Sequence, residues 1–214
     1  MKSDNAVLYK IVGPIVSILF KLYYRPTIIG KSYIPKDKPA VIAGNHIHAL
    51  DPILVGVCTK RVLHSLAKKE LHDGRFGFFF RRAGTIPVDL YAASNKEALA
   101  EAIRRLNQGK LVGVSPEAKR NYTKQLLLPF KFGAVSMAQK TGSMIVPYAI
   151  TGDYQFRSKN LKIVFGKPLD ISKMNLGEAN SLLYQTVESL LLHSKQETGS
   201  GSHLWTQNYW KRKN

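Results

Sequence analysis

A histidine and an aspartate separated by four residues are the side chains of this sequence best suited to do chemistry. His46 and Asp51 follow a short apolar run, residues 41–43, which predicts a strand that ends at Gly44. Asp51 and Pro52 predict a helix start, with Asp51 as N-cap and the proline at the first helical position. Across the turn, the carboxylate could fix the imidazole tautomer and stabilise its charged form. The alternative is that Asp51 only caps the helix and His46 is a polar loop residue.

Other kinds of reactive site have less support in the sequence. The spacing of His46, His48 and Asp51 could begin a metal site, but no compact set of further His or Cys ligands follows. Cys58 lies in an apolar segment and is expected to pack there. We find no nucleophile elbow and no phosphate-cradling glycine loop. We therefore expect no metal, no cofactor and no covalent intermediate, and the simplest scheme is a lone general base that acts on a substrate hydroxyl.

Three polar clusters follow directly on predicted strands. They are Asn45-His46 after residues 41–43, Lys68-Lys69-Glu70 after residues 62–67, and Glu117-Ala118-Lys119-Arg120 after residues 111–114. In open α/β sheets, sites gather at the carboxyl ends of the strands, so these clusters would meet if the strands run parallel. The sequence thus predicts one site that contains a histidine, an aspartate and several cations.

Strand-like and helix-like segments alternate along the chain. Further strands are predicted at residues 146–151 and 161–165, and the last helix is an amphipathic segment at residues 177–194. Another helix is expected from a capping box at Ser94 to a stop at Gly109. This order predicts an α/β fold with a central, mostly parallel or mixed sheet flanked by helices.

Residues 6–24 are predicted to form an N-terminal interfacial helix. The charge-free part, residues 11–20, is shorter than the about 20 apolar residues that a spanning helix needs. No small-residue cleavage site follows, as a signal peptide would require. Lys10 and Lys21 at the two ends favour a helix that lies on a membrane. The alternative is a helix packed on the body of the protein.

We expect three segments: a membrane-interface helix at residues 1–26, a folded domain at 27–197, and a tail at 198–214. The tail is rich in Gly and Ser and then aromatic and basic, so it could be a flexible basic end, a vector-derived extension or a second surface anchor.

The strong positive charge indicates a polyanionic partner. The chain has 214 residues, and 32 Lys and Arg against 14 Asp and Glu give a net charge of +18 that is spread along the sequence. An anionic phospholipid membrane, a nucleic acid and an acidic protein all fit, but no basic stripe or nucleic-acid motif is present, which disfavours nucleic acid. The single cysteine excludes an intramolecular disulfide and fits a reducing compartment.

Taken in order, the motifs resemble those of the lysophosphatidic acid (1-acylglycerol-3-phosphate) acyltransferase family, within the glycerolipid acyltransferase superfamily. The similarity runs through roughly residues 27–170. The matching pieces are Ile28-Ile29-Gly30 with Ile34-Pro35, Asn45-His46-x4-Asp51-Pro52, Ala67-Lys68-Lys69-Glu70-Leu71, Gly84-Thr85-Ile86-Pro87-Val88-Asp89, Pro116-Glu117-x-x-Arg120, Phe130-Lys131 with Gly133-Ala134, and Ile145-Val146-Pro147. The third block departs from the family's usual Glu-Gly-Thr-Arg at Ala118 and Lys119, and Leu90 replaces an arginine.

The resemblance implies an acyl transfer from acyl-ACP or acyl-CoA to the hydroxyl of a lysophospholipid, most simply lysophosphatidic acid to phosphatidic acid. It implies that His46 is the general base and that Asp51 orients it. The substrate-binding residues that it implies are Lys68 and Arg120 on the acceptor phosphate, Glu117 on the acceptor or Arg120, Pro147 on the donor side, and Asn45 and Lys119 beside them.

Such an enzyme would be monotopic, on the cytoplasmic face of an anionic membrane. Two alternatives remain at this point. The same fold could act on a different hydroxylated lipid, because Ala118, Lys119 and Leu90 alter the expected phosphate site. Alternatively, the chain could be a non-enzymatic basic protein that binds membranes or nucleic acid, which would not need His46.

Overall fold

A seven-stranded sheet organises the part of the chain that the computed structural model describes, residues 7–75, 77–92 and 95–199. The strand order is β1-β7-β6-β2-β5-β3-β4, and every neighbouring pair is parallel except β6 and β7. The strands are β1 (Thr27–Ile29), β2 (Ala40–Gly44), β3 (Leu63–Lys68), β4 (Ile86–Val88), β5 (Leu111–Val114), β6 (Met144–Thr151) and β7 (Lys162–Phe165). The predicted mostly parallel or mixed sheet is therefore confirmed.

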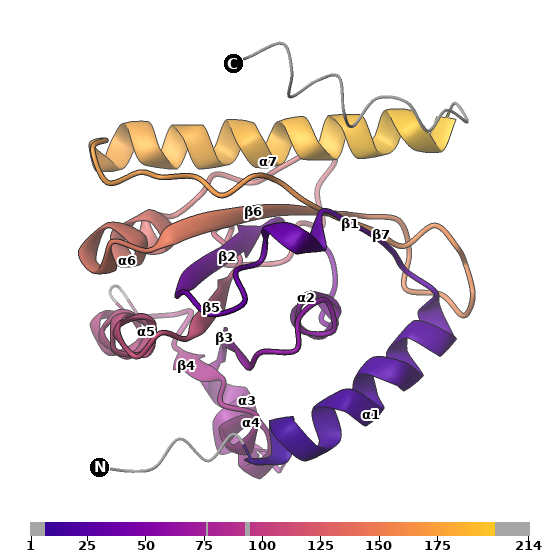
Figure 1. Cartoon of the computed structure of the whole chain (residues 1–214), viewed down its shortest axis with the longest axis horizontal. Helices are drawn as coiled ribbons and strands as arrows, with labels where there is room; N and C mark the ends of the chain where they lie inside the picture. The colour runs from indigo at the N-terminus through magenta and orange to yellow at the C-terminus, as the bar shows by residue number, and fades with distance from the viewer. Residues whose placement is uncertain (1–6, 76, 93–94, 200–214) are drawn as a thin grey trace.

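Helices cover both faces of this sheet (Figure 1). They are α1 (Val7–Tyr24), α2 (Asp51–Gly56), α3 (Lys69–Asp73), α4 (Gly77–Arg82), α5 (Lys96–Asn107), α6 (Gly133–Thr141) and α7 (Leu176–Gly199), with a 3-10 turn η1 (Lys31–Tyr33). The long helix α7 lies along one face, and α1 and α2 lie on the other. The beginning of α1 lies beside α4.

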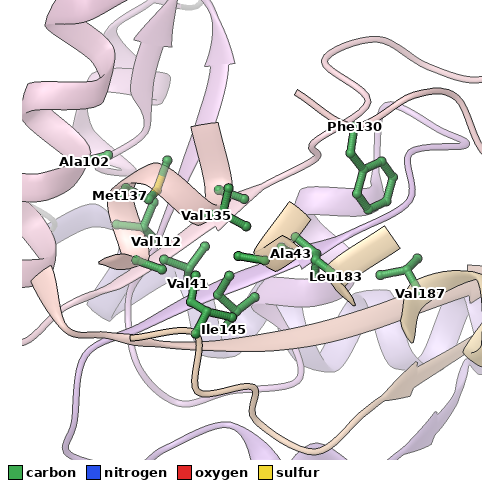
Figure 2. Packing of buried hydrophobic residues seen from close by; sticks show 14 of the residues in the cluster. Val41, Ala43, Ala102, Val112, Phe130, Val135, Met137, Ile145, Leu183 and Val187 are labelled. Atoms are coloured by element: carbon green, nitrogen blue, oxygen red, sulfur yellow. The ribbon is translucent and has the colours of Figure 1, made fainter. Parts of the chain in front are cut away.

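Alternating side chains of the central strands bury two apolar clusters. Val41 and Ala43 of β2 pack with residues of α5, α6 and α7, a cluster that Figure 2 shows from close by. Ala40 and Ile42 point to the other face, where they pack with α2 and with Phe20 of α1. This alternation follows from the two-residue period of a strand and explains why β2 is buried along its whole length.

Several elements differ from the predictions. Asp51 is the first residue of α2 and not its N-cap, because its carboxylate turns back toward the preceding loop. Ser94 of the predicted capping box lies outside the described residues; the side chain of Asn95 bonds the backbone of Asp89 and does not cap α5. The last helix runs five residues beyond the predicted end at 194, to Gly199, and the rest of the expected tail also lies outside the described residues.

Helix α1 has a buried end and a long exposed apolar surface. Phe20 is buried and Tyr24 packs beside it, so the end of α1 contributes to the core. The exposed apolar side chains are Val12, Ile15, Val16, Ile18, Leu19, Leu22 and Tyr23. Within the described part of the chain, no helix has both the length and the apolar character that crossing a bilayer requires.

Candidate active site

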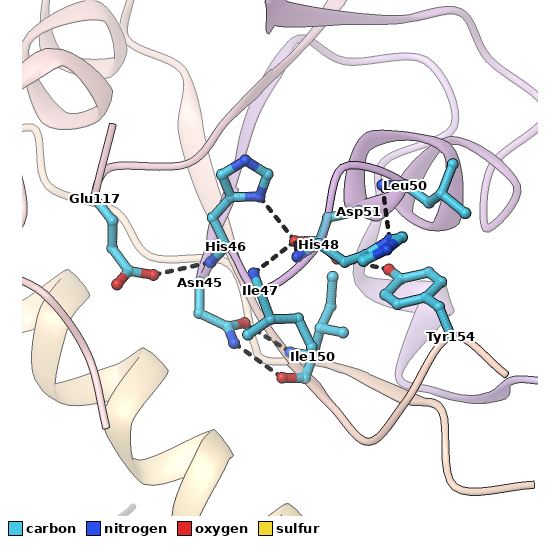
Figure 3. Close-up of polar contacts among 9 residues, drawn as sticks. All are labelled: Asn45, His46, Ile47, His48, Leu50, Asp51, Glu117, Ile150 and Tyr154. Atoms are coloured by element: carbon cyan, nitrogen blue, oxygen red, sulfur yellow. Dashed lines mark hydrogen bonds and ion pairs between the residues drawn. The ribbon is translucent and has the colours of Figure 1, made fainter. Parts of the chain in front are cut away.

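The imidazole of His46 is hydrogen-bonded to the carboxylate of Asp51. The loop after β2 carries His46 back toward the start of α2, where its Nδ1 lies 2.8 Å from Asp51 Oδ2 (Figure 3). Because a carboxylate can only accept, Nδ1 carries the proton and the neutral ring keeps Nε2 as a base. Asp51 is fully buried, whereas His46 is half-buried and lines a cleft. The pair thus presents one basic nitrogen to a ligand in that cleft.

The Asp51 carboxylate is held by four hydrogen bonds. Besides His46, Oδ2 accepts the backbone N–H groups of Ile47 at 2.7 Å and His48 at 2.8 Å. Oδ1 accepts the hydroxyl of Tyr154 at 2.6 Å. This satisfied environment lets a charged carboxylate stay buried and fixes the direction in which the His46 ring points.

The loop after β5 holds the backbone of His46. Glu117 is buried, and its two carboxylate oxygens each accept at 2.8 Å, one from the N–H of His46 and the other from that of Leu128. The N–H of Asn121 donates to the carbonyl of His46, also at 2.8 Å. Glu117 therefore bonds the backbone of His46, and the described structure shows no ion pair between Glu117 and Arg120. The alternative that Glu117 acts on the acceptor stays a prediction. Burial raises the pKa of Glu117, and these two donors partly offset that effect.

Three cations line the same cleft as His46. Lys68 ends β3, and Lys119 and Arg120 follow β5; all three are exposed and line the cleft. The carboxyl ends of β2, β5 and β3 are adjacent in the parallel part of the sheet, so the predicted convergence of the three clusters is confirmed. Arg120 lies over the ring of Tyr122, 5.2 Å from its centroid.

Ala118, between Glu117 and these cations, has a left-handed backbone with φ of 60°. Glycine adopts this conformation without the steric cost that Cβ adds. The conformation that the usual glycine of this block would favour is therefore retained here with an alanine.

The cleft combines this polar end with an apolar wall. It has a volume of about 2080 Å³. The apolar wall includes Val12, Val16 and Ile18 of α1, Ile53 of α2, and Phe79 and Phe80 of α4. A cationic end and an apolar wall suit a ligand with an anionic head and a hydrocarbon tail.

Two predicted substrate-binding residues are buried in or beside the central strands. The Asn45 amide is buried, donates to the carbonyl of Ile150 and accepts from its N–H, so in this structure it fixes the end of β2 to β6. Pro147 is buried in β6 beside Gly166, and the residues two before and after it, Ile145 and Ala149, belong to the α7 side of the core. Strand alternation places Pro147 on that side also, on the opposite face of the sheet from α1 and α2. Its predicted role on the donor side stays a prediction.

Two residues that contact His46 or Asp51 were not found from the sequence. Tyr154 lies in the loop between β6 and β7, 103 residues from Asp51, and no motif surrounds it. Asn121, whose N–H donates to the carbonyl of His46, directly follows the third polar cluster but was not selected as a candidate site residue. Among the residues that the structure describes, no three His, Cys, Asp or Glu side chains come together as a set of metal ligands.

Comparisons with known proteins give a consistent result. A family model described as Acyltransferase matches residues 25–151. The 1-acyl-sn-glycerol-3-phosphate acyltransferase of Bacillus subtilis is 29% identical over 168 residues, which are 76% of this chain and 82% of that protein. The protein of the same name from Borreliella burgdorferi is 31% identical over 67% of this chain, but the match spans only 57% of that protein.

A solved structure shares the fold. The crystal structure of the 1-acyl-sn-glycerophosphate (LPA) acyltransferase PlsC from Thermotoga maritima matches 89% of this chain and 91% of its own, with a TM-score of 0.67 and 22% sequence identity. The similarity therefore extends over nearly all of both chains.

Proposed function

The chain belongs to the acyltransferase family, and from that premise we propose that it moves a fatty acyl group from an acyl thioester to the free hydroxyl of lysophosphatidic acid, giving phosphatidic acid. The observation that carries this proposal is the hydrogen-bonded pair of His46 and Asp51 at the cationic end of a cleft with an apolar wall. Proteins named for this reaction are among the relatives. Family membership also argues against a purely non-enzymatic binding protein.

His46 is the general base of the proposed reaction. Its Nε2 takes the proton of the acceptor hydroxyl as that oxygen bonds to the thioester carbonyl carbon. The C–S bond then breaks, and the departing thiolate takes the proton back from His46, so the products are an ester and a free thiol. The buried charge of Asp51 stabilises the imidazolium that exists between these two steps. No acyl-enzyme forms.

The three cations hold the acceptor phosphate in this scheme. Arg120 can offer a planar fork to two phosphate oxygens, whereas Lys68 and Lys119 act as point charges. Among the described residues, none of the three is in an ion pair, so a phosphate would not have to displace a carboxylate. This arrangement supports an acceptor with a phosphate close to its reacting hydroxyl.

We further propose that the enzyme is monotopic on the cytoplasmic face of an anionic membrane. The exposed apolar side chains of α1 would enter one leaflet. Helix α4 adds Phe78 and Phe79, which are about half exposed, and the guanidinium of Arg82 lies 4.8 Å from the Phe78 ring centroid. Phe76, which precedes α4, lies outside the described residues. Because both helices line the cleft, an acceptor could reach it from the bilayer.

One observation supports a different acceptor for the same acyl-transfer reaction. Lys119 adds a positive charge to the third block beside Arg120, so a hydroxylated lipid with a different anionic headgroup is the other candidate.

The donor, acyl-ACP or acyl-CoA, is a substrate and not a bound cofactor. Both donors carry negative charge, which the +18 chain would attract.

An acyl-transfer assay tests the proposed substrate. The purified protein would be offered a panel of lysolipids in mixed micelles, each with acyl-ACP and with acyl-CoA. We expect the highest kcat/KM with lysophosphatidic acid and a much lower value with phosphate-free monoacylglycerol. Equal rates with the two acceptors would contradict the phosphate-bearing acceptor, and a higher rate with another anionic lysolipid would favour the second candidate.

A further inference from the structure

The hydroxyl of Tyr154 lies against the Asp51 oxygen that His46 does not use. Tyr154 Oη donates to Asp51 Oδ1 at 2.6 Å, on the opposite side of the carboxylate from the 2.8 Å bond to His46 (Figure 3). A short O–H···O⁻ bond of this kind is among the stronger hydrogen bonds in proteins. Tyr154 is the one side chain besides His46 that bonds this carboxylate in the described structure.

The surroundings of Tyr154 keep its hydroxyl a donor. Burial and the negative charge of Asp51 raise the pKa of Tyr154 well above its usual range. The phenol therefore stays protonated at any pH at which the enzyme would work. Its bond to Asp51 restrains one carboxylate oxygen, which leaves the other in place for the His46 ring.

Aromatic rings from α1 and from the catalytic loop hold Tyr154. The ring of His48 stacks on it with centroids 4.4 Å apart. Tyr24 and Phe20 of α1 contact it edge to face, with centroids 5.7 Å and 6.4 Å away. The same helix that exposes an apolar surface thus packs, through its last turns, on the residue that bonds Asp51.

We propose that Tyr154 is a positioning residue for the His46–Asp51 pair, and that α1 acts on the pair through Tyr24, Phe20 and the Tyr154 hydroxyl. This inference rests on the proposed roles of His46 and Asp51. It makes α1 part of the active-site support as well as a candidate membrane contact. A shift of α1 would change the hydrogen bonding of Asp51 through Tyr154, whether or not α1 also contacts a lipid in the cleft.

The test compares Tyr154→Phe with Tyr184→Phe, a tyrosine of α7 that packs on Phe130 away from the pair. Each variant loses one hydroxyl and keeps its ring, but only Tyr154 donates to Asp51. We expect kcat to fall roughly tenfold or more in Tyr154→Phe, with KM for the acceptor within about twofold, because a hydrogen bond to a charged group is lost. Tyr184→Phe should keep the wild-type kcat.

The pH profile separates positioning from a general loss of structure. Without the hydrogen bond from Tyr154, the Asp51 carboxylate interacts more strongly with the protonated His46 ring. The imidazole therefore keeps its proton to higher pH. The acid limb of kcat/KM should therefore move to higher pH in Tyr154→Phe and stay in place in Tyr184→Phe. The other titratable groups beside the pair are His48, Glu117, Tyr148 and Cys58, and both variants retain them.

A double-mutant cycle tests the role of α1. Tyr24→Leu removes the ring and should lower kcat in the wild-type background, but have little further effect once Tyr154 is phenylalanine, because the path to Asp51 is already broken. Equal effects in both backgrounds would contradict the coupling. An unchanged kcat and pH profile in Tyr154→Phe, with His46→Ala inactive, would overturn this inference alone. Activity in His46→Ala would instead overturn the proposed function on which it rests.

Discussion

Arg120 and Lys119 are adjacent, exposed and both cationic, yet only one of them matches the family's third block. A guanidinium forms two parallel hydrogen bonds with a phosphate, which an ammonium cannot do. The two side chains therefore provide a matched comparison at one point of the loop. If Lys119 has become part of the phosphate site, its removal will have the same selectivity as the removal of Arg120.

We predict that Arg120→Ala weakens binding of a phosphate-bearing acceptor by about 1.5–3 kcal/mol, the scale of a hydrogen bond to a charged group. The loss should be much smaller for a phosphate-free analogue. Affinity or KM for both acceptors, measured in parallel with Lys119→Ala, checks this. Equal losses for the two acceptors would mean that Arg120 supports the loop and not the ligand.

At the residue scale, the sequence predicted the candidate reactive side chains better than the residues that hold them in place. His46 and Asp51 could be paired because only four residues separate them. Lys68 and Arg120 could be placed near the pair because their polar clusters follow strands. Tyr154 could not be predicted, because its contact with Asp51 depends on how β6, β7 and α1 meet. Glu117 was expected on the substrate side, since nothing local shows that its carboxylate would meet two backbone N–H groups.

The last turns of helix α1 have one packed face and one exposed face, a division that its sequence pattern did not reveal. Phe20 and Tyr24 pack into the core, while Ile18, Leu19 and Leu22 are each about 60% exposed. Deletion of residues 1–24 would remove Phe20 from the core along with the membrane surface. Substitutions on the exposed face are therefore the appropriate test of membrane binding.

We predict that the triple variant Ile18→Ser, Leu19→Ser, Leu22→Ser binds anionic vesicles much more weakly than wild type. Its free energy of unfolding should change little, because these side chains are exposed in the free protein. Phe20→Ala is the contrasting variant and should lose about 3–5 kcal/mol of stability. Vesicle flotation and urea unfolding measure the two effects, and undiminished flotation of the triple variant would contradict the proposed role of α1.

A second element-scale prediction concerns His64 in β3. His64 is buried and its Nδ1 donates to the carbonyl of Gly84 at 2.7 Å. Burial, its largest influence, lowers the pKa of His64 below the usual value of a histidine. The unfolded chain therefore binds a proton here more readily than the folded protein, so stability should fall as pH decreases through the usual histidine range near 6.5.

The variant His64→Asn keeps a donor to Gly84 but cannot be protonated. We predict that its unfolding free energy falls less than that of wild type between pH 7.5 and 5.5, as measured by urea titration. The control His193→Asn alters an exposed histidine of α7 and should follow the wild-type curve. A variant curve parallel to wild type would show that His64 does not contribute to acid sensitivity.

At the element scale, a helix or strand could be predicted only where it is long enough to show a clear apolar pattern. Apolar runs identified β2, β3, β5 and most of β6 and β7 to within a residue or two. β1 and β4 have three residues each, too few to show an alternating pattern, and α3 and α4 have only five and six. The antiparallel pairing of β6 and β7 depends on their connecting loop and could not be inferred from either strand.

For the whole molecule, the spread of positive charge predicts a two-part interaction with membranes. Electrostatic attraction to anionic lipid is screened by salt, whereas burial of the α1 face is not. We predict that binding to anionic vesicles weakens as salt rises and keeps a salt-resistant remainder. Flotation over a salt series measures both parts. Strong binding of duplex DNA at physiological salt, with none to vesicles, would contradict a membrane partner.

The central claim is that His46 acts as the base in acyl transfer, and one rate measurement tests it most directly. The initial rate of acyl transfer to lysophosphatidic acid would be compared for wild type, His46→Ala and the distant control His193→Ala, with folding checked by circular dichroism. The account predicts that His46→Ala loses about 10²–10⁴-fold in kcat while remaining folded, as expected for loss of a general base, and that His193→Ala is unaffected. A folded His46→Ala protein with a kcat near that of wild type would contradict the account.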